Sequence, residues 1–238
     1  MGDVPMVLYV MGAGRSGSTV LDIALNSDER IGGYGELINL TRSVWPNDEY
    51  GSDGIRCSQS PFWTSVRNEW ARLCGGDCLT EYRALQCRFE RIRSLPLVRW
   101  CHPGRNRDLS RYGLLTRNMY LALSHVGGTD IIVDSSKSPA RAYAVSRSTG
   151  LQLVIIHLVR DVRGVIWSLS KSYAKDERDG VQNEIHGRGT LRASLDWAVT
   201  NSGADWVRRQ LPRESTVVLR YEDVVCDSAN SLAEVSSL

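Results

Sequence analysis

The fold of this chain is decided by the stretch Val7-Leu8-Tyr9-Val10-Met11-Gly12-Ala13-Gly14-Arg15-Ser16-Gly17-Ser18-Thr19-Val20-Leu21. It starts with a run of apolar residues, continues through a glycine-rich turn and ends in hydroxyl residues that open a helix-like segment. Glycines let the backbone curl so that successive N–H groups point inward, and the positive end of the next helix attracts anions. The stretch therefore predicts a strand, a phosphate-binding turn and a helix in that order.

Three other short segments share the apolar character of the first strand at residues 6–11. They are residues 131–133, 153–159 and 216–221, and each is nearly continuous in apolar residues, as expected for strands that helices cover on both faces of a parallel sheet. Helices are expected at residues 19–25, 62–73, 80–94, 111–125, 138–148, 162–173 and 190–209. This alternation predicts an α/β protein with a central parallel sheet flanked by helices, in a single domain over residues 1–238.

Composition excludes several classes of protein. The chain has 238 residues, of which 42% are hydrophobic and 24% charged, as in ordinary globular domains. No stretch approaches the roughly 20 consecutive apolar residues of a membrane span, and the start lacks the pattern of a secretory signal, so we expect a cytoplasmic protein. The net charge of +2 is too small to indicate binding to nucleic acid or to a membrane. Any anion site must therefore be local.

The basic residues are mostly arginines, and only Lys137, Lys171 and Lys175 are lysines. Residues 83–117 hold nine arginines against two acids, which fits either a solvated helical face or a surface that attracts anions. The six cysteines are too sparse for a disulfide scaffold, and the spacing Cys74-x3-Cys78 is not that of a zinc site. We expect no metal.

The glycine-rich turn also has the spacing of a nucleoside triphosphate loop, Gly12-x4-Gly17. Ser18-Thr19 follows where a triphosphate-binding protein carries Lys-Ser or Lys-Thr. That lysine and a Mg²⁺ ion neutralise a highly charged triphosphate, so its absence counts against ATP. Arg15 lies inside the turn and supplies a cation there instead.

A dinucleotide fingerprint is a second alternative, because Gly12-x-Gly14-x-x-Gly17 matches its glycine pattern. The acid expected about twenty residues later could only be Glu36. The residues before it, 27–35, are too broken by glycines and polar groups to form a buried strand. The match is therefore weak.

A second anion-binding pattern follows the strand at residues 153–159. That strand ends in Arg160, and the helix after it carries Ser168. Because the carboxyl ends of parallel strands meet at one edge, Arg160 is expected beside the glycine-rich turn. A guanidinium and a hydroxyl there could hold a second phosphate, although Arg160-Asp161 could equally be an ordinary ion pair.

Together the two segments resemble the sulfotransferases that use 3′-phosphoadenosine 5′-phosphosulfate (PAPS). Their 5′-phosphosulfate loop is similar to Gly14, Arg15, Ser16, Gly17, Ser18 and Thr19. Their 3′-phosphate motif is similar to Leu158-Val159-Arg160-Asp161 with Ser168. With an arginine at this position, the loop is more similar to that of the tyrosylprotein and bacterial branches of the family. The resemblance, which runs from Val7 to about Asp227, implies a P-loop-like three-layer fold, PAPS as donor and no metal.

The segment Gly33-Tyr34-Gly35-Glu36 resembles a Gly-Glu pair of the same family, in which the carboxylate is the general base. The role is chemically reasonable, because an acceptor hydroxyl must lose a proton as it attacks sulfur. The resemblance thus implies that Glu36 is the base. His102 and His125 are reserve candidates, whereas His157 lies in an apolar strand and is interpreted as structural.

The segment Asp134-Ser135-Ser136-Lys137-Ser138-Pro139 resembles a turn of the family that borders donor and acceptor. A fixed cation there stabilises the charge that develops on the bridging oxygen as the S–O bond breaks. This role is assigned to Lys137 and Arg15, with Ser135 and Ser136 as orienting residues. Alternatively, Lys137 is an exposed turn residue and Asp134 is the magnesium-binding carboxylate of a nucleotide hydrolase.

Near the end of the chain, Arg220-Tyr221-Glu222-Asp223 resembles a strand end of the family, which implies that Tyr221 helps to shape the nucleotide pocket. The segment Cys57-Ser58-Gln59-Ser60-Pro61-Phe62-Trp63 resembles one in bacterial members. Family members usually continue through a closing segment that completes the 3′-phosphate site, and we expect this chain to lack it.

The sequence thus predicts an enzyme, a PAPS-dependent sulfotransferase that transfers a sulfuryl group to a hydroxyl or amine. The expected partner is a small-molecule, glycan or peptide acceptor, with no nucleic acid and no membrane span. The alternatives are a degenerate P-loop nucleotide kinase or NTPase, and a non-catalytic nucleotide-binding protein.

Overall fold

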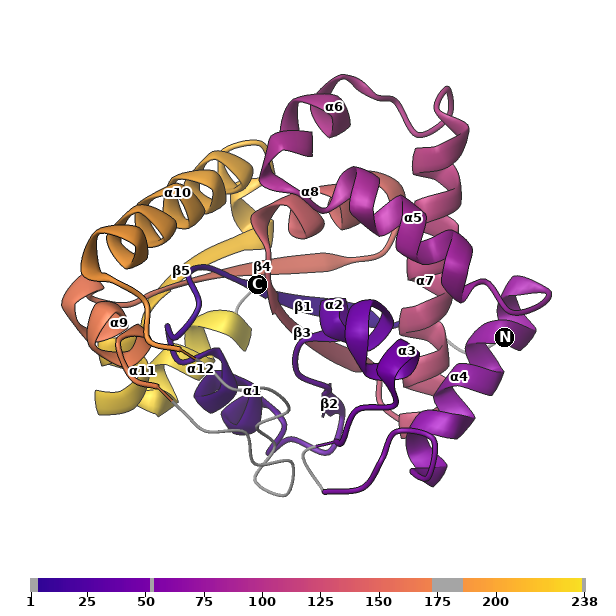
Figure 1. The fold of residues 1–238 in the computed structure, drawn as a ribbon, viewed down its shortest axis with the longest axis horizontal. Coiled ribbons are helices and arrows are strands. Elements are labelled where there is room, and N and C mark those ends of the chain that lie inside the picture. The colour runs from indigo at the N-terminus through magenta and orange to yellow at the C-terminus, as the bar shows by residue number, and fades with distance from the viewer. Residues whose placement is uncertain (1–3, 52–53, 173–185, 237–238) are drawn as a thin grey trace.

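The computed structural model describes residues 4–51, 54–172 and 186–236, so Lys175 and Tyr173 lie outside the described residues. Five parallel strands form one sheet in the order β2-β3-β1-β4-β5 (Figure 1). The strands are β1 (Met6–Met11), β2 (Ile31–Gly33), β3 (Ile131–Lys137), β4 (Leu153–Val159) and β5 (Thr216–Arg220). The strand that leads into the glycine-rich turn is therefore the central one.

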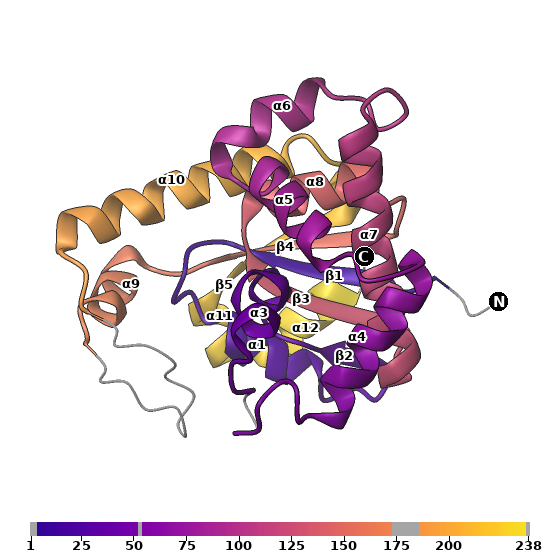
Figure 2. The ribbon, with the colours of Figure 1, turned by 45° about the vertical axis from the view of Figure 1, so that its right-hand side comes forward.

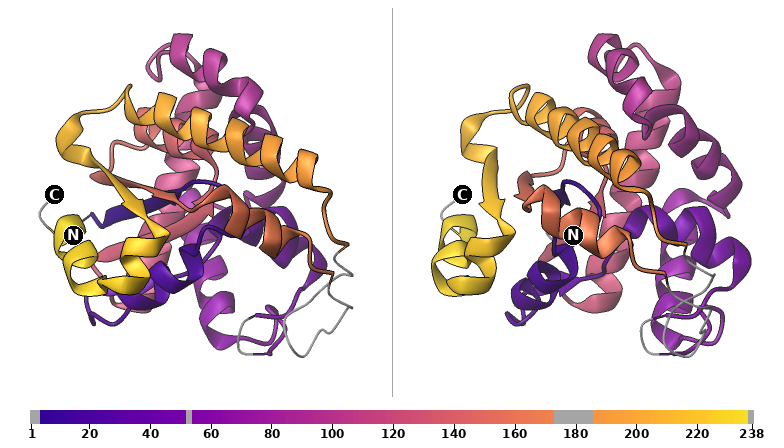
Figure 3. Two further views of the ribbon diagram at one scale, coloured as in Figure 1. Left: turned by 90° about the vertical axis from the view of Figure 1, so that its left-hand side faces the viewer. Right: turned by 60° about the vertical axis from the view of Figure 1, so that its left-hand side comes forward.

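Helices cover both faces of this sheet, as the continuous apolar strands predict. Tyr9 and Met11 point into the larger of two hydrophobic clusters, and Leu8 and Val10 point into the smaller one. The larger cluster lies under α4 (Pro61–Cys74), α5 (Leu79–Phe89), α6 (Leu95–Trp100), α7 (Arg107–Gly127), α8 (Pro139–Ser148) and α10 (Thr190–Arg208). The smaller cluster lies under α1 (Ser18–Leu25), α11 (Tyr221–Cys226) and α12 (Ser228–Ser236). Figures 2 and 3 show the resulting three layers.

Short helical segments complete the chain. Directly after β2 come α2 (Leu37–Asn39), a π-helical turn (Leu40–Val44) and α3 (Trp45–Asn47). The remaining segments are the 3₁₀ turns η2 (Ile92–Ser94) and η3 (Arg213–Ser215), and the helix α9 (Val162–Leu169) after β4. The segment from α2 to α3 begins next to Glu36, the predicted base.

The structure confirms all four predicted strands and corrects one interpretation. Residues 27–35, which the sequence analysis took as too broken for a strand, contain β2 at the sheet edge. Its three residues include two glycines, so no apolar pattern indicates it. Strand β3 runs four residues past its predicted end at 133, because its polar side chains form hydrogen bonds inside the protein.

The predicted helices are all present, with corrected ends. The helix expected at 80–94 stops at Phe89, where η2 follows, and α9 stops at Leu169 rather than at 173. Helix α7 begins four residues earlier than predicted, because the Asn106 side chain accepts a hydrogen bond from the Leu109 N–H and caps it. Helix α6 and the segment from α2 to α3 were not predicted, because they are too short to show a helical period.

Candidate active site

The glycine-rich turn connects β1 to α1 and can be formed only by small residues at two positions. At Gly12, where φ is 145°, an added Cβ would lie 2.3 Å from the Leu158 carbonyl oxygen. At Gly17, where φ is 89°, it would lie 2.1 Å from the Tyr221 ring. Both values of φ favour glycine. The backbone of the turn is thus pressed against β4 on one side and the start of α11 on the other.

This turn has the properties of an anion site. The Ser16 hydroxyl is buried, with the residue 1% exposed, and no hydrogen-bond partner for it occurs in the described part of the chain. Helix α1 begins after Gly17, and no side chain caps its first turn. The N–H groups at the start of a helix need external acceptors, and the helix dipole favours negative ones. A phosphate at this turn would fit both the orphaned hydroxyl and these N–H groups.

Arg160 lies against the same turn. Its Nη1 donates a hydrogen bond to the Arg15 carbonyl oxygen at 3.0 Å, and its guanidinium lies 4.2 Å from the centre of the Tyr221 ring. Tyr221 in turn packs on Gly17. The two predicted phosphate motifs, which are 145 residues apart in the sequence, therefore meet at one edge of the sheet.

Asp161 does not hold Arg160, contrary to the alternative of an ordinary ion pair. Its carboxylate pairs with Arg163 at 2.7 Å, and this hydrogen-bonded arginine lowers the pKa of Asp161 to about 2. The backbone of the segment is fixed separately, because Trp197 Nε1 donates to the Arg160 carbonyl oxygen at 3.0 Å. The Arg160 guanidinium is therefore free of a carboxylate partner among the described residues.

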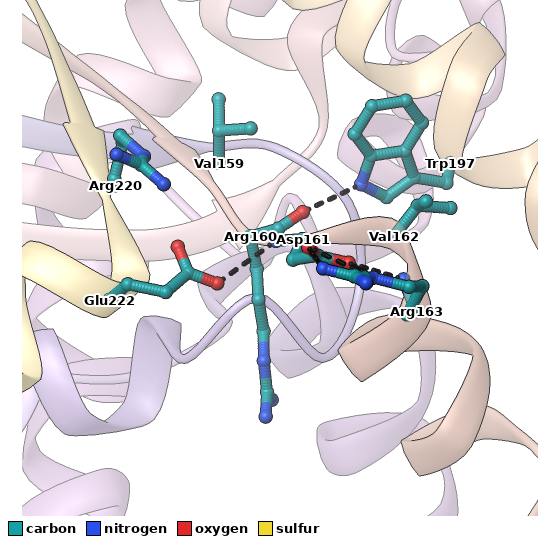
Figure 4. Close-up of a pocket in the computed structure, with 8 residues that line it drawn as sticks. All are labelled: Val159, Arg160, Asp161, Val162, Arg163, Trp197, Arg220 and Glu222. Carbon is teal, nitrogen blue, oxygen red and sulfur yellow. Dashed lines mark hydrogen bonds and ion pairs between the residues drawn. The ribbon is translucent and has the colours of Figure 1, made fainter.

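A hollow of about 370 Å³ opens beside Arg160 (Figure 4). It is lined by Val159, Arg160, Asp161, Val162, Arg163, Trp197, Arg220 and Glu222. Figure 4 shows the Arg160 side chain leading away from Trp197 and Arg220. The hollow combines guanidinium groups with apolar surface, which suits a nucleotide better than a purely ionic ligand.

Ser168 lies near Arg160 without touching it. Gly164 of α9 packs against Arg160, since a Cβ added there would lie 3.1 Å from the arginine Nε. Ser168 follows four residues later, so it is on the same face of α9. No hydrogen bond joins Ser168 to Arg160 in the described ranges.

Glu36 and Lys137 form an ion pair next to the turn. Lys137 Nζ donates to one oxygen of the Glu36 carboxylate, and Asn39 Nδ2 donates to the other at 3.1 Å. The Lys137 carbonyl oxygen accepts a hydrogen bond from the Gly12 N–H at 3.0 Å, which connects the end of β3 to the glycine-rich turn. The predicted base and the predicted cation are therefore neighbours.

The two predicted catalytic cations share an unusual backbone conformation. Of the three described non-glycine residues with positive φ, two are Arg15, at 66°, and Lys137, at 63°. This region costs a residue with a Cβ of order 1–3 kcal/mol, and such strain concentrates at functional sites. The lysine is thus part of a constrained site rather than a freely exposed turn.

Asp22 of α1 holds the loop that carries Glu36, and the sequence analysis missed it. It is 7% exposed, and its Oδ2 accepts hydrogen bonds from the Gly35 N–H at 3.0 Å and the Ser135 hydroxyl at 2.7 Å. Burial raises the pKa of Asp22, while these two hydrogen bonds oppose that rise. One signal could have indicated it, since Asp22 is the single acid in the otherwise apolar run of α1.

Ser136 fixes the other side of the same loop. Its hydroxyl accepts a hydrogen bond from the Ile38 N–H at 2.8 Å and donates to Asp134. Tyr34 packs beneath, with its ring 5.6 Å from Phe62 and 6.3 Å from Trp63. The serines predicted as orienting residues therefore do contact the loop on both sides of Glu36.

Asp134 is enclosed in a buried network and does not present itself to a metal ion. Its carboxylate accepts hydrogen bonds from Tyr120 at 2.7 Å, from Arg141 Nε at 3.2 Å and from Ser136. Arg141 also pairs with the buried Glu90. This arrangement gives the NTPase alternative no support.

Neither of the two reserve bases, His102 and His125, contacts Glu36 in the described structure, and His157 is the structural residue that the sequence analysis expected. His157 is buried, its Nε2 is 3.0 Å from Asn201 Oδ1, and burial lowers its pKa. This confirms its structural role. His125 Nδ1 lies 2.8 Å from Glu69 Oε1 near the end of α7, on the side of the sheet where the strands begin. His102 Nδ1 accepts a hydrogen bond from the Gly104 N–H at 3.2 Å.

The described residues contain neither a candidate metal site nor a candidate membrane-spanning helix. No group of three or more His, Cys, Asp or Glu side chains is arranged to hold a metal ion in these ranges. Likewise, none of the described helices combines the length and the apolar character that crossing a bilayer requires.

Comparisons with known proteins agree with this geometry. No curated protein sequence matches the chain. The sulfotransferase domain of the curacin biosynthetic pathway superimposes with a TM-score of 0.54 at 18% identity, over 98% of this chain and 73% of that one. The sulfotransferase domain of the Synechococcus PCC 7002 olefin synthase gives 0.51 at 19%, over 98% and 73%. A sulfotransferase of Mycobacterium avium gives 0.53 at 12%, over 98% and 63%.

At these identities the solved structures show that the fold is shared. Like theirs, the fold is a P-loop-like α/β architecture, and in this chain the glycine-rich turn follows the central strand. The sequence itself matches the model of the sulfotransferase family over residues 7–237, which is nearly the whole chain. The chain therefore belongs to the sulfotransferase family and is a transferase that moves sulfuryl groups.

Proposed function

We propose that this sulfotransferase uses PAPS as its donor and sulfates a hydroxyl or amine of a small-molecule, glycan or peptide acceptor. The observation that carries the proposal is the hydrogen bond from Arg160 to the Arg15 carbonyl oxygen, at 3.0 Å. A donor with phosphates at both ends of an adenosine needs two anion sites at one sheet edge. These two residues supply one such pair of sites.

The turn would bind the 5′ end of the donor. Its Ser16 hydroxyl has no hydrogen-bond partner in the described structure, and no side chain caps the first turn of α1. The residues that would contact this end of the donor are Gly14, Arg15, Ser16, Gly17, Ser18 and Thr19. Arg160 and Ser168 would bind the 3′-phosphate. Tyr221 would hold Arg160 in place through ring contact, and so shape the pocket.

Glu36 would act as the general base and Lys137 with Arg15 as the stabilising cations. The acceptor O–H or N–H gives its proton to the Glu36 carboxylate while the acceptor atom bonds to sulfur. The bond between sulfur and the bridging phosphate oxygen breaks at the same time, and the electron pair stays on that oxygen. A cation aimed at this oxygen stabilises the transition state more than the ground state.

The Glu36–Lys137 ion pair gives this scheme a specific requirement. Lys137 Nζ now donates to the Glu36 carboxylate. For catalysis the ammonium must turn to the leaving oxygen, which frees a carboxylate oxygen for the acceptor proton. Asn39 stays within reach to hold the other oxygen at 3.1 Å.

We also propose a cytoplasmic location. All six cysteines are free thiols in the structure. Disulfides form and persist mainly in oxidising compartments, so six reduced thiols support a reducing one.

Calorimetry and a transfer assay test the donor. Binding should be tighter for 3′-phosphoadenosine 5′-phosphate (PAP) than for AMP, ADP with Mg²⁺ or NAD. Transfer of ³⁵S-labelled sulfate from PAPS to an acceptor, without added metal, would then show catalysis. Preference for ADP with Mg²⁺ would contradict the proposal, as would PAP binding without transfer to any member of an acceptor panel.

A further inference from the structure

A strongly basic segment lies outside the site just described. Residues 91–107, which we call the basic tip, connect α5 to α7 through η2 and α6. Figures 1 and 2 show α6 and the loop after it at the top of the molecule, the outermost segment in both views. The basic tip contains five arginines, at positions 91, 93, 99, 105 and 107, and no Asp or Glu.

The arginines of the basic tip are not neutralised by the protein. All five are exposed, and none of them forms an ion pair with a carboxylate of the described residues. The arginines on either side differ, because Arg88 pairs with Asp108 and Arg111 pairs with Glu81 at 2.8 Å. The unpaired arginines of the basic tip thus lie in the sequence between two arginines that form ion pairs, and they concentrate positive charge there.

Apolar side chains are exposed among these arginines. Trp100 is 85% exposed, and Leu97, three residues earlier on α6, is 39% exposed. The opposite side of α6 anchors the helix to the core through Leu95 and Val98. The Arg99 guanidinium lies 5.9 Å from the centre of the Trp100 ring. An exposed tryptophan and leucine beside five unpaired arginines form an amphipathic patch, and this combination indicates a contact surface.

We propose that the basic tip docks on the surface of a bilayer that contains anionic lipids. Arginines pair with phosphate headgroups, and tryptophan with a neighbouring leucine enters the region between headgroups and acyl chains. An acidic polymer would pair with the same arginines, but it offers no apolar layer for Leu97, whereas the boundary between headgroups and acyl chains takes up both Leu97 and Trp100. The apolar residues therefore favour a membrane over a polyanion. The contact lies on the surface of the bilayer and is independent of the donor site.

Vesicle binding tests this proposal. The protein should sediment with vesicles that contain about one third phosphatidylglycerol and not with pure phosphatidylcholine vesicles, and added salt should weaken binding. Since each arginine near an anionic surface contributes about fivefold, the triple variant Arg99→Gln/Arg105→Gln/Arg107→Gln should bind about 100-fold more weakly. Trp100→Ala should lose about tenfold, because a large apolar side chain no longer leaves water.

Matched controls distinguish an effect of the basic tip from an effect of the protein's overall charge. Arg30→Gln/Arg209→Gln/Arg213→Gln removes three exposed arginines elsewhere, and Trp167→Ala removes another exposed tryptophan. These variants should bind vesicles within twofold of the wild type. Thermal unfolding of every variant checks the fold.

Three results would overturn the proposal. One is equal binding to anionic and neutral vesicles. Another is vesicle binding that the Trp100 and arginine variants do not weaken. The third is binding to dextran sulfate, unchanged by Trp100→Ala, in a protein that does not bind anionic vesicles, because this would identify the partner as an acidic polymer.

Discussion

Replacing Asp22 by alanine should uncouple catalysis from donor binding. The Asp22 carboxylate accepts hydrogen bonds from Gly35 at 3.0 Å and Ser135 at 2.7 Å, and Gly35 immediately precedes Glu36. A hydrogen bond to a charged group contributes about 1.5–3 kcal/mol. Its loss would leave the buried Ser135 hydroxyl and the half-buried Gly35 N–H without this acceptor. The raised pKa of Asp22 shows that burying this carboxylate opposes part of that gain. We therefore expect the free energy that holds the loop in its ordered conformation to fall by about 2–4 kcal/mol in Asp22→Ala.

The loss should be seen in turnover. A displacement of about 1 Å in a reacting group can lower a rate about 100-fold. Without Asp22, the residues just before Glu36 keep backbone bonds to β3, from Tyr34 N–H to Val133 and from Ser135 N–H to Gly35, and the packing of the Tyr34 ring. We expect kcat of Asp22→Ala to fall about 30- to 100-fold, with PAP affinity within about threefold. Asp22→Asn keeps an oxygen acceptor and should retain most of kcat.

Labelled sulfate transfer gives kcat and KM, calorimetry gives PAP affinity, and thermal unfolding shows how much of the protein is folded. Asp28→Ala is the matched control, because this acid lies just beyond the same helix and is exposed, paired with Arg30. Unchanged kcat in Asp22→Ala would refute the reasoning. A loss of PAP affinity as large as the loss of kcat would also refute it, since Asp22 would then shape the donor turn rather than the base.

Three other changes test separate parts of the account. Glu36→Gln should lower kcat by a factor of about 10²–10⁴, the usual contribution of a general base, and leave PAP affinity within about twofold by calorimetry; retained turnover would remove Glu36 from the mechanism. Gly17→Ala should weaken PAP binding at least tenfold, because its φ of 89° and the Tyr221 ring leave no room for a Cβ; normal binding would show that the turn is not the donor site. Burial lowers the pKa of His157 below that of the unfolded chain, so its contribution to stability is present above about pH 6.5 and lost as the pH falls below it; His157→Gln should flatten the dependence of the melting temperature on pH between 5 and 7, and an unchanged slope would count against a neutral buried imidazole.

The parts of the fold that the sequence predicted are those with a continuous local signal. Strands β1 and β4 are runs of apolar residues, and the glycines after β1 predict the turn that follows it. The position of Arg160 beside that turn followed from a topological rule, because parallel strands end at the same edge. The family resemblance added the role of Glu36, which no local pattern indicates.

The remaining features depend on contacts between residues far apart in the sequence. Arg141 binds both Asp134 and Glu90, and Glu90 is 51 residues away from it in the sequence. This buried network gives Asp134 a structural role. The hydrogen bond from Ser135 to Asp22 joins residues 113 positions apart, and the same carboxylate holds Gly35, the residue before Glu36. The Arg-rich region had two interpretations because ion pairs such as Arg111–Glu81, 30 residues apart, form only through helix packing. Strand β2 was missed because pairing with β3, not apolar character, defines it.

The most direct test of the central claim is the ratio of PAP to AMP affinity, measured by calorimetry in the wild type and in Arg160→Gln. A charge-assisted pair with the 3′-phosphate contributes about 1.5–3 kcal/mol, or about 10- to 150-fold. We predict that the wild type prefers PAP by about this factor and that Arg160→Gln binds the two nucleotides almost equally, with AMP affinity unchanged. The same PAP preference in both proteins would contradict the account.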